Sequence, residues 1–407
     1  MLVPPRLLGG MYRQGLALSL ALLASGSWLA GVQGASPKEH TDVAQIQALI
    51  AQLGSPKFSA RKAASEKLAQ IGLPAFSALE EAARHTDREV RYRAEKVLAI
   101  VRQNDLERRL AEFLAASDTP SPASLPAWSR FQKAFGNTAA SRELFVQMQR
   151  ADSELLAAFD MDVRKGVEVL SQRTLTYQQA QQAKALQNGL LVPLSLGEIT
   201  ALLFVAGEED VRLSSQTVMA VLTFCNQPGF REAMLKTQTR ELPSRLLGRV
   251  IQRSEDAAAY QAMRLATEYD LKEGLAPALK MLEVPNLKSR FYLQYALLLI
   301  VKYGDASHLP RIELLLDDKT QLGTATQDGV RREIQIRDSA LAAGVLLTKQ
   351  EIKDYFTIPM PTRTNQQGVS PAAYSLLQLG FENDEVRAAA QQKFLASQPR
   401  QKLLQKK

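Results

Sequence analysis

Residues Ser55 to Val101, SPKFSARKAASEKLAQIGLPAFSALEEAARHTDREVRYRAEKVLAIV, contain the clearest indication of the fold class. Apolar residues recur every three or four positions from Ala60 to Ile71, and they do so again from Val90 onward. This spacing is typical of amphipathic helices. A helix of about four turns cannot bury its own apolar stripe. The stretch therefore predicts short helices that stack on their neighbours.

The joints between these predicted helices carry residues typical of helix ends. Ser55 before Pro56 predicts an N-cap with proline in the first turn, and Gly72 predicts the end of the first helix. Thr86 and Glu89 have the spacing of a capping box, which predicts the start of the third helix. Tight joints of this kind favour helices packed in sequence order.

An arginine followed three residues later by an alanine recurs along the chain. The small alanine allows a neighbouring helix to approach closely, and the arginine can reach carboxylates or carbonyl groups across a joint. We therefore expect structural roles in a helical repeat for these residues. The motif residues are Arg61 and Ala64; Glu89, Val90, Arg91 and Ala94; Arg337 and Ala340; and Val386, Arg387 and Ala390.

Residues 1–35 differ from the rest of the chain. Arg6 and Arg13 are the only charged residues there, and they precede an apolar run from Leu16 to Ala30 that is followed by Gly34 and Ala35. This order is typical of a secretory signal peptide, so we expect cleavage near Gly34 or Ala35 and export to the periplasm or beyond. The alternative is an uncleaved N-terminal anchor, which would want an apolar run of about 20 residues.

The segment from Glu89 to Ala94 resembles the motif Asp/Glu-x-Val-Arg-x-x-Ala of the HEAT-repeat family, and the same phrase returns from Asp384 to Ala390. The resemblance implies an all-α fold, a HEAT-like α-solenoid of stacked antiparallel helix pairs in the armadillo-like helical class. With an export signal in front, the chain looks like exported helical-repeat proteins of a planctomycete-type bacterial kind. The resemblance concerns architecture and implies neither a partner nor a reaction.

Turn signals divide the chain into segments. The run SDTPSPASLP, residues 117–126, is the clearest break. No alternating pattern predicts a strand longer than a few residues, and Lys319 to Val330 is predicted as a polar loop. The predicted segments are a signal peptide (1–35), N-terminal HEAT-like repeats (36–117), a linker (118–126), a helical-repeat array (127–396) with a HEAT-like part at 269–350, and a basic tail (397–407).

The charge of the chain bears on its partner, and its cysteine content bears on disulfide formation. The chain has 50 Lys and Arg against 42 Asp and Glu, with both signs interspersed. This mild excess is ordinary for solubility, and export separates the protein from nucleic acid, so we expect no nucleic-acid partner. Cys225 is the single cysteine and lies in an apolar helical stripe, which predicts a buried thiol and no intrachain disulfide.

Familiar catalytic motifs do not occur in the sequence. It contains no Walker loop, no dinucleotide-binding glycine motif, no His-Glu-x-x-His and no Cys-x-x-Cys. The histidines His40, His85 and His308 share no ligand spacing, and the acidic trio at 208–210 lacks the alternating oxygens of a calcium loop. We therefore expect no catalytic residue, no cofactor and no metal. A Ser-His-Asp set assembled only in three dimensions stays open.

Two classes of function fit these observations. We favour a non-catalytic extracytoplasmic scaffold that mediates protein–protein interaction, because a solenoid presents an extended surface to a protein or peptide. The alternative is a repeat-based enzyme such as a HEAT-like lyase. An envelope-assembly factor differs from the scaffold only in its partner. After signal cleavage we expect no stable membrane insertion, and the sequence leaves the partner's identity and the oligomeric state open.

Overall fold

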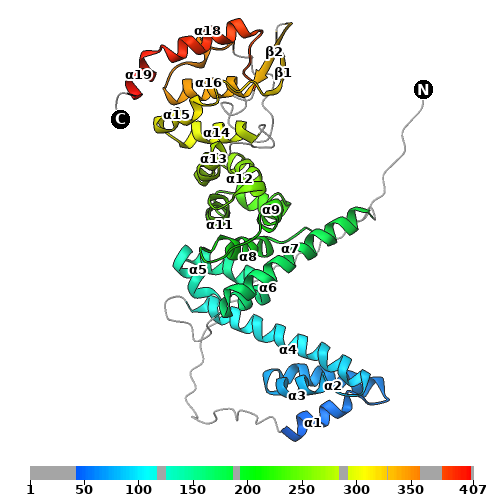
Figure 1. Ribbon diagram of the computed structural model, residues 1–407. Coiled ribbons are helices and arrows are strands. Elements are labelled where there is room, and N and C mark those ends of the chain that lie inside the picture. The colour runs from blue at the N-terminus through cyan, green and yellow to red at the C-terminus, as the bar shows by residue number, and fades with distance from the viewer. Residues whose placement is uncertain are drawn as a thin grey trace, which may run out of the picture. The chain divides into compact units, whose positions relative to one another are not determined.

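Helices dominate the part of the chain that the structure describes (Figure 1). The computed structural model describes residues 43–116, 125–186, 193–283, 292–327, 329–357 and 378–404. The prediction of a mainly helical protein is confirmed for these residues. The predicted signal peptide and most of the predicted linker, residues 118–124, lie outside them. Within these ranges no helix has the length and apolar character needed to cross a membrane.

The elements follow one another along the chain. The α-helices are α1 (Val43–Gln52), α2 (Phe58–Ile71), α3 (Phe76–Ala82), α4 (Arg88–Ala115), α5 (Trp128–Phe135), α6 (Ala139–Met161), α7 (Val163–Leu186), α8 (Leu196–Gly207), α9 (Ser215–Phe224), α10 (Pro228–Leu235), α11 (Glu241–Gln252), α12 (Asp256–Tyr269), α13 (Leu275–Leu282), α14 (Leu293–Tyr303), α15 (Leu309–Glu313), α16 (Ile336–Leu347), α18 (Asp384–Leu395) and α19 (Gln398–Leu404). The 3-10 helices are η1 (Leu73–Ala75), η2 (Lys272–Gly274), η4 (Ala306–His308) and η5 (Ile352–Asp354), and the strands are β1 (Gln321–Gln327) and β2 (Val330–Gln335).

The contacts divide the chain into two compact units, Met1–Val101 and Arg102–Lys407. Each unit has its own cluster of buried apolar side chains. The division falls inside α4, whereas the sequence places a domain boundary at residues 118–126. A helix that contributes residues to two cores shows no composition shift where one core ends, so turn signals could not reveal this division.

The core of the first unit is built from α1, α2, α3 and the first part of α4. Leu53, Leu68 and Leu79 are fully buried in it, together with the small residues Ala64 and Ala94. These alanines lie at the positions where the sequence predicts close helix contacts. Alternating large and small buried residues let short helices approach and bury stripes that none could cover alone.

The helix ends of the first unit agree with the sequence only in part. Gly72 ends α2 with a φ of 72°, a conformation that glycine adopts readily, so the predicted stop is confirmed. The predicted starts are displaced. Helix α2 begins at Phe58, after Ser55 and Pro56. The cap of α4 is Asp87, whose Oδ1 accepts from the backbone N–H of Glu89 at 2.7 Å, and the predicted capping residue was Thr86.

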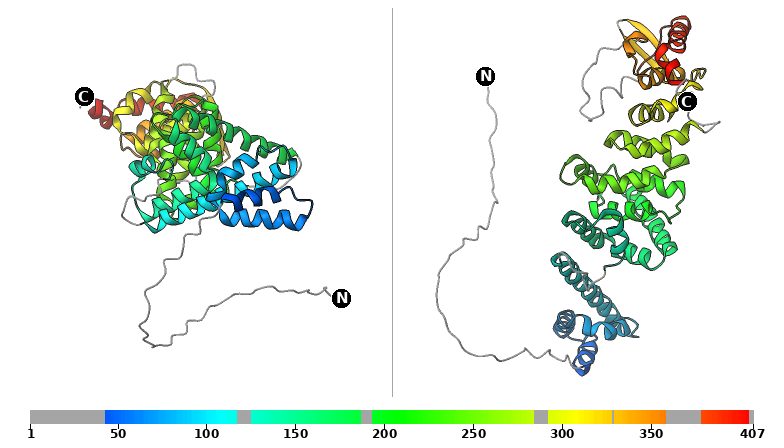
Figure 2. Two further views of the ribbon diagram at one scale, coloured as in Figure 1. Left: turned by 90° about the horizontal axis from the view of Figure 1, so that it is seen from below. Right: turned by 90° about the vertical axis from the view of Figure 1, so that its left-hand side faces the viewer.

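In the second unit, helices stack in the order of the sequence (Figures 1 and 2). Helices α6, α8, α11, α12, α14, α16 and α18 form successive contacts, each with the next in this series. Helix α8 is buried around almost its whole circumference, as its continuous apolar sequence favours. Its predicted capping box is confirmed, because Ser195 and Glu198 exchange side-chain and backbone hydrogen bonds at its start.

A β-hairpin replaces the loop predicted from Lys319 to Val330. Strands β1 and β2 pair antiparallel, and the backbone of Glu333 also bridges Phe381. The prediction was wrong because β1 is almost entirely polar, with no alternation of apolar residues to mark it. On β2, Ile334 is buried as expected of a strand face, but the alternate buried position is occupied by Arg332. The all-α prediction therefore needs this one correction among the described residues.

Candidate functional site

The repeat-motif residues of the first unit hold helix joints. Nη1 of Arg61 donates to the carbonyl oxygen of Ser55 at 2.7 Å and to that of Pro56 at 3.0 Å. Nη1 of Arg91 makes the equivalent pair of bonds to the carbonyls six and five residues before it, at 2.6 and 3.2 Å. Successive helices thus close their joints in the same way. This arrangement was expected from the motif, and it occupies the guanidinium groups structurally.

Glu89 links two helices of the first unit. Its Oε1 lies 2.7 Å from Nε of Arg93 and 3.0 Å from Nε of Arg61. The hydrogen bond from Arg93 is the main reason that the pKa of Glu89 is lowered, and the charges of Arg93 and Arg61 act in the same direction. Because Glu89 lies at the surface, we assign this pair of contacts a small contribution to stability.

The remaining motif positions divide between buried and exposed. The alanines Ala64, Ala94, Ala340 and Ala390 are all buried, as their role in close helix packing requires. Val90 is buried as well, with 4% of its surface exposed, but Val386 is 49% exposed. The two valines occupy the same motif position, so the phrase beginning at Asp384 does not pack as the earlier one does.

The motif arginines of the second unit belong to an ion network. Nε of Arg387 donates to Oδ1 of Asp338 at 2.7 Å, and both side chains are almost completely buried. Asp384 accepts from Arg387 and, at 2.7 Å, from Nη2 of Arg337. Nη2 of Arg387 also reaches the carbonyl of Glu333 on β2. The network joins α16, α18 and the hairpin, which indicates a structural role.

Burial of Asp338 shifts the pKa of its carboxyl group. Removal from water raises its pKa to about 6, against the opposing effects of the Arg387 hydrogen bond and charge. The carboxylate also accepts the backbone N–H of Gln335 at 2.8 Å and so caps α16.

The predicted motif residues therefore lie in two separate structural groups, one in each unit, and they do not converge on one site.

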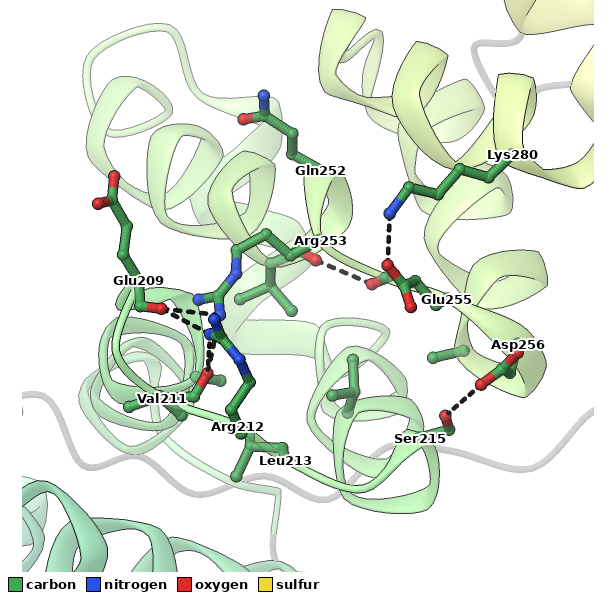
Figure 3. Close-up of a pocket in the computed structure, with 15 residues that line it drawn as sticks. Glu209, Val211, Arg212, Leu213, Ser215, Gln252, Arg253, Glu255, Asp256 and Lys280 are labelled. Atoms are coloured by element: carbon green, nitrogen blue, oxygen red, sulfur yellow. Dashed lines mark hydrogen bonds and ion pairs between the residues drawn. The ribbon is translucent and has the colours of Figure 1, made fainter.

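The second unit has an open groove beside the loop that joins α8 to α9. Two adjoining pockets of about 770 and 740 Å³ share Glu209, Gln252 and Arg253, and we call their union the α8–α9 groove. Figure 3 shows the first of the two pockets. The loop, the end of α11, the start of α12 and residues of α5 and α13 line it. The charged lining residues are Arg130, Lys133, Glu208, Glu209, Asp210, Arg212, Arg249, Arg253, Glu255, Asp256 and Lys280.

Local sequence positions the walls of this groove. Helix α8 ends at Gly207, where a Cβ would lie 3.1 Å from Cβ of Arg249, so glycine allows α11 to approach closely. Helix α9 starts after Ser214, whose side chain accepts from the backbone N–H of Thr217. Across the groove, α12 begins at Asp256 with a φ of 48°, an uncommon conformation for a residue other than glycine. Such strain is often found at functional sites.

Arg212, within the loop, and Arg253, just after α11, both donate to backbone carbonyls of the loop. Nη1 of Arg212 donates to the carbonyls of Glu209 and Val211 at 2.6 and 3.1 Å. Nη2 of Arg253 donates to the same two carbonyls at 3.3 and 2.7 Å, and its Nη1 donates to the carbonyl of Glu208. The two guanidinium groups thus share two neutral acceptors, and Figure 3 shows them side by side in the groove.

Several other charges of the groove form ion pairs. Arg130 lies 2.9 Å from Oδ2 of Asp210, and Lys280 pairs with Glu255. Nη2 of Arg249 lies 2.9 Å from Oε1 of Glu208, but this ion pair lacks the alignment of a hydrogen bond. Burial raises the pKa of Glu208, and the charges of Arg249 and Arg130 oppose the increase.

The acidic trio at 208–210 faces arginine side chains. Glu208 and Asp210 turn to arginines, and no group of three or more potential metal-ligating side chains occurs in the described ranges. The sequence indicates the trio as a possible metal-binding segment because its three acidic residues are consecutive. Arg212 belongs to the same loop. Arg130 on α5, Arg249 on α11 and Arg253 just after α11 were missed, because only the fold brings them to this loop.

Comparison with known proteins adds no identification. No protein-family model matches the chain, and no curated protein matches it.

The thiol of Cys225 is fully buried, as predicted, and burial raises its pKa, which disfavours the reactive thiolate. Among the described residues, we take the α8–α9 groove as the candidate site, because it is open and lined by many charged side chains.

Proposed function

We propose that the protein is a non-catalytic helical-repeat scaffold that binds a protein or peptide partner outside the cytoplasm. The observation that carries the proposal is the α8–α9 groove, which is open, rich in charged side chains and lined by residues from several successive helices. A surface contributed by consecutive helices is typical of repeat proteins that bind extended partners. The groove is also too polar to resemble the mostly apolar pockets that enclose small ligands.

A HEAT-like α-solenoid is the architecture that we propose for this scaffold. Two features support it. The joints closed by Arg61 and Arg91 have the same pattern of carbonyl contacts, and helices of the second unit contact one another in sequence order. In such an array each helix pair depends mainly on its neighbours, so stability and binding surface are both spread along the chain.

The location outside the cytoplasm is part of the same proposal. It is supported by the arrangement of residues 1–35, where two arginines precede an apolar run and small residues. N-terminal sequencing of the exported protein tests it. A mature chain that begins near Gly34 or Ala35 supports a cleaved signal, and a chain that still begins at Met1 supports the anchor.

The scaffold function is tested by capture of partners from an envelope fraction with the tagged, purified chain, followed by a salt titration of the recovered complex. The net charge is modest, so an increase from about 50 to about 200 mM salt should weaken binding far less than the roughly thousandfold loss typical of many phosphate contacts. A polyanion as sole ligand, with steep salt dependence, would contradict a protein scaffold. Turnover of a small molecule by the purified chain would favour the HEAT-like lyase alternative.

A further inference from the structure

The paired guanidinium groups of Arg212 and Arg253 have an unusual environment. They lie together on the carbonyls of Glu209 and Val211, and neither donates to a carboxylate within the described residues. Two like charges at such close range repel each other, and neutral carbonyl groups compensate them only in part. A bound anion would compensate them fully.

The acidic residues nearby do not supply that anion. The carboxylate of Glu209 points away from both guanidinium groups (Figure 3). Glu255 is held by Lys280, and Asp256 lies beside the hydroxyl of Ser215 at 3.4 Å. These carboxylates belong to the groove, but each is oriented to another partner or to solvent.

The electrostatic field at Arg253 agrees with this picture. Burial is the main cause of its lowered pKa, and the charges of Arg212 and Arg249 lower it further. The opposing effects of Glu209 and Asp210 are smaller. A negative group that enters the groove would therefore meet a locally positive field although both signs are present around it.

The geometry of the groove favours a carboxylate on a protein segment. Arg212 is exposed, and its Nε–H and Nη2–H groups donate to no acceptor among the described residues, so they are available to a ligand. A guanidinium group binds a carboxylate through two parallel hydrogen bonds. Lys133 on α5 places further positive charge along the groove, whereas the charge of Lys280 is balanced by Glu255.

We propose that Arg212 and Arg253 bind a carboxylate of an acidic, extended protein segment that lies in the α8–α9 groove. This inference rests on the proposed scaffold function and specifies the class of its partner. One Asp or Glu side chain of that segment contacts the arginine pair, and a neighbouring acidic residue lies toward Lys133.

The test measures binding of a fluorescent peptide rich in Asp and Glu to the purified full chain. An identical peptide with Asn and Gln at the acidic positions serves as the matched ligand. We expect saturable binding of the acidic peptide and at least about tenfold weaker binding of the neutral one, because charge-assisted hydrogen bonds are roughly twice as strong as neutral ones.

Arg212→Gln is the central variant, because Arg212 lies at the surface and its replacement leaves the core unchanged. Its Kd for the acidic peptide should rise about tenfold, and Arg212→Glu should abolish binding. Arg164→Gln removes the same charge from an exposed position on α7 outside the groove, and its Kd should stay within about twofold of the wild-type value.

Several results would overturn the inference. Equal binding of the neutral peptide would show that carboxylates are not recognised. Equal weakening by Arg164→Gln and Arg212→Gln would assign binding to net charge. Inorganic polyphosphate that binds more tightly and with steep salt dependence would indicate a polyanion site. An envelope partner that binds Arg212→Gln as well as wild type would contradict this inference alone and leave the scaffold function intact, whereas turnover of a substrate would contradict the scaffold itself.

Discussion

Arg387 and Asp338 form an ion pair in which both side chains are out of contact with water. The two residues are not equivalent. Removal of Arg387 would leave the Asp338 carboxylate buried without its main partner. Asp338→Asn keeps one oxygen acceptor for Arg387, which also contacts Asp384, and loses the hydrogen bond from the backbone N–H of Gln335. We expect Arg387→Met to cost about 3–5 kcal/mol at pH 7 and Asp338→Asn to cost much less. Chemical denaturation of both variants measures this, and equal costs would contradict the assigned asymmetry.

The raised pKa of Asp338 predicts a pH dependence of stability. The folded state has a pKa of about 6 for this group, above its ordinary value of 3.8, so the folded chain binds more protons between these values. Its contribution to stability is present below about pH 4 and is lost as pH rises through about 6, by about 3 kcal/mol at most. Asp338→Asn lacks this titration, so wild type should lose stability relative to the variant over that range. Parallel curves for the two proteins would refute the prediction.

Ala94 and Lys96 occupy opposite environments on α4. Ala94 is completely buried, while Lys96 is exposed with its Nζ 4.6 Å from the ring centroid of Tyr92. Ala94→Glu would bury an unpaired carboxyl group, which should cost about 3–5 kcal/mol. Lys96→Ala should cost within about 0.5 kcal/mol. Thermal unfolding of the two variants decides this, and similar shifts would show that the faces of α4 are assigned wrongly.

At the scale of elements, the contact between α6 and α8 depends on Gly197. A Cβ added there would lie 2.3 Å from the carbonyl oxygen of Gln147 and 2.8 Å from its carbonyl carbon. These are backbone atoms of α6 and cannot move aside as a side chain can. We therefore expect Gly197→Ala to destabilise the chain by about 3 kcal/mol through displacement of α8.

The matched control is Gly323→Ala on β1, where a Cβ would meet no atom within 4 Å and φ is not positive. It should change the free energy of unfolding by less than about 0.5 kcal/mol. Denaturant unfolding of both variants tests the comparison. A tolerated Gly197→Ala would mean that α6 and α8 are farther apart than described.

At the scale of the whole molecule, the two units have separate cores, so a destabilising substitution in one unit should leave the stability of the other unchanged. Helix α4 contributes to both apolar clusters, but the buried side chains around Ala94 belong only to the first unit. Ala94→Glu should therefore accelerate amide hydrogen exchange in residues 43–101 and leave exchange in α8, α9, α11 and α12 unchanged. Mass spectrometry of peptides from both regions measures this. Uniform acceleration along the chain would indicate a single cooperative unit.

Helix content and several helix ends could be read from the amino acids alone. The apolar period around Leu68 and Val97, the stop at Gly72 and the capping box of Ser195 with Glu198 all depend on residues within one or two turns. The buried motif alanines belong to the same class, because each lies on a helix face that its own sequence marks as apolar. Features that depend only on neighbouring residues can be predicted from a single sequence.

Features that join distant segments become visible only in the folded chain. The β1–β2 hairpin has a polar sequence and is held through Glu333 by Phe381, far along the chain. Likewise, Arg387 finds Asp338 from another helix, and Arg212 meets Arg253 on one loop. The sequence determined which segments are helices because helical order is local. It left the hairpin, the ion network and the groove undetermined because burial and charge pairing depend on which surfaces the fold brings together.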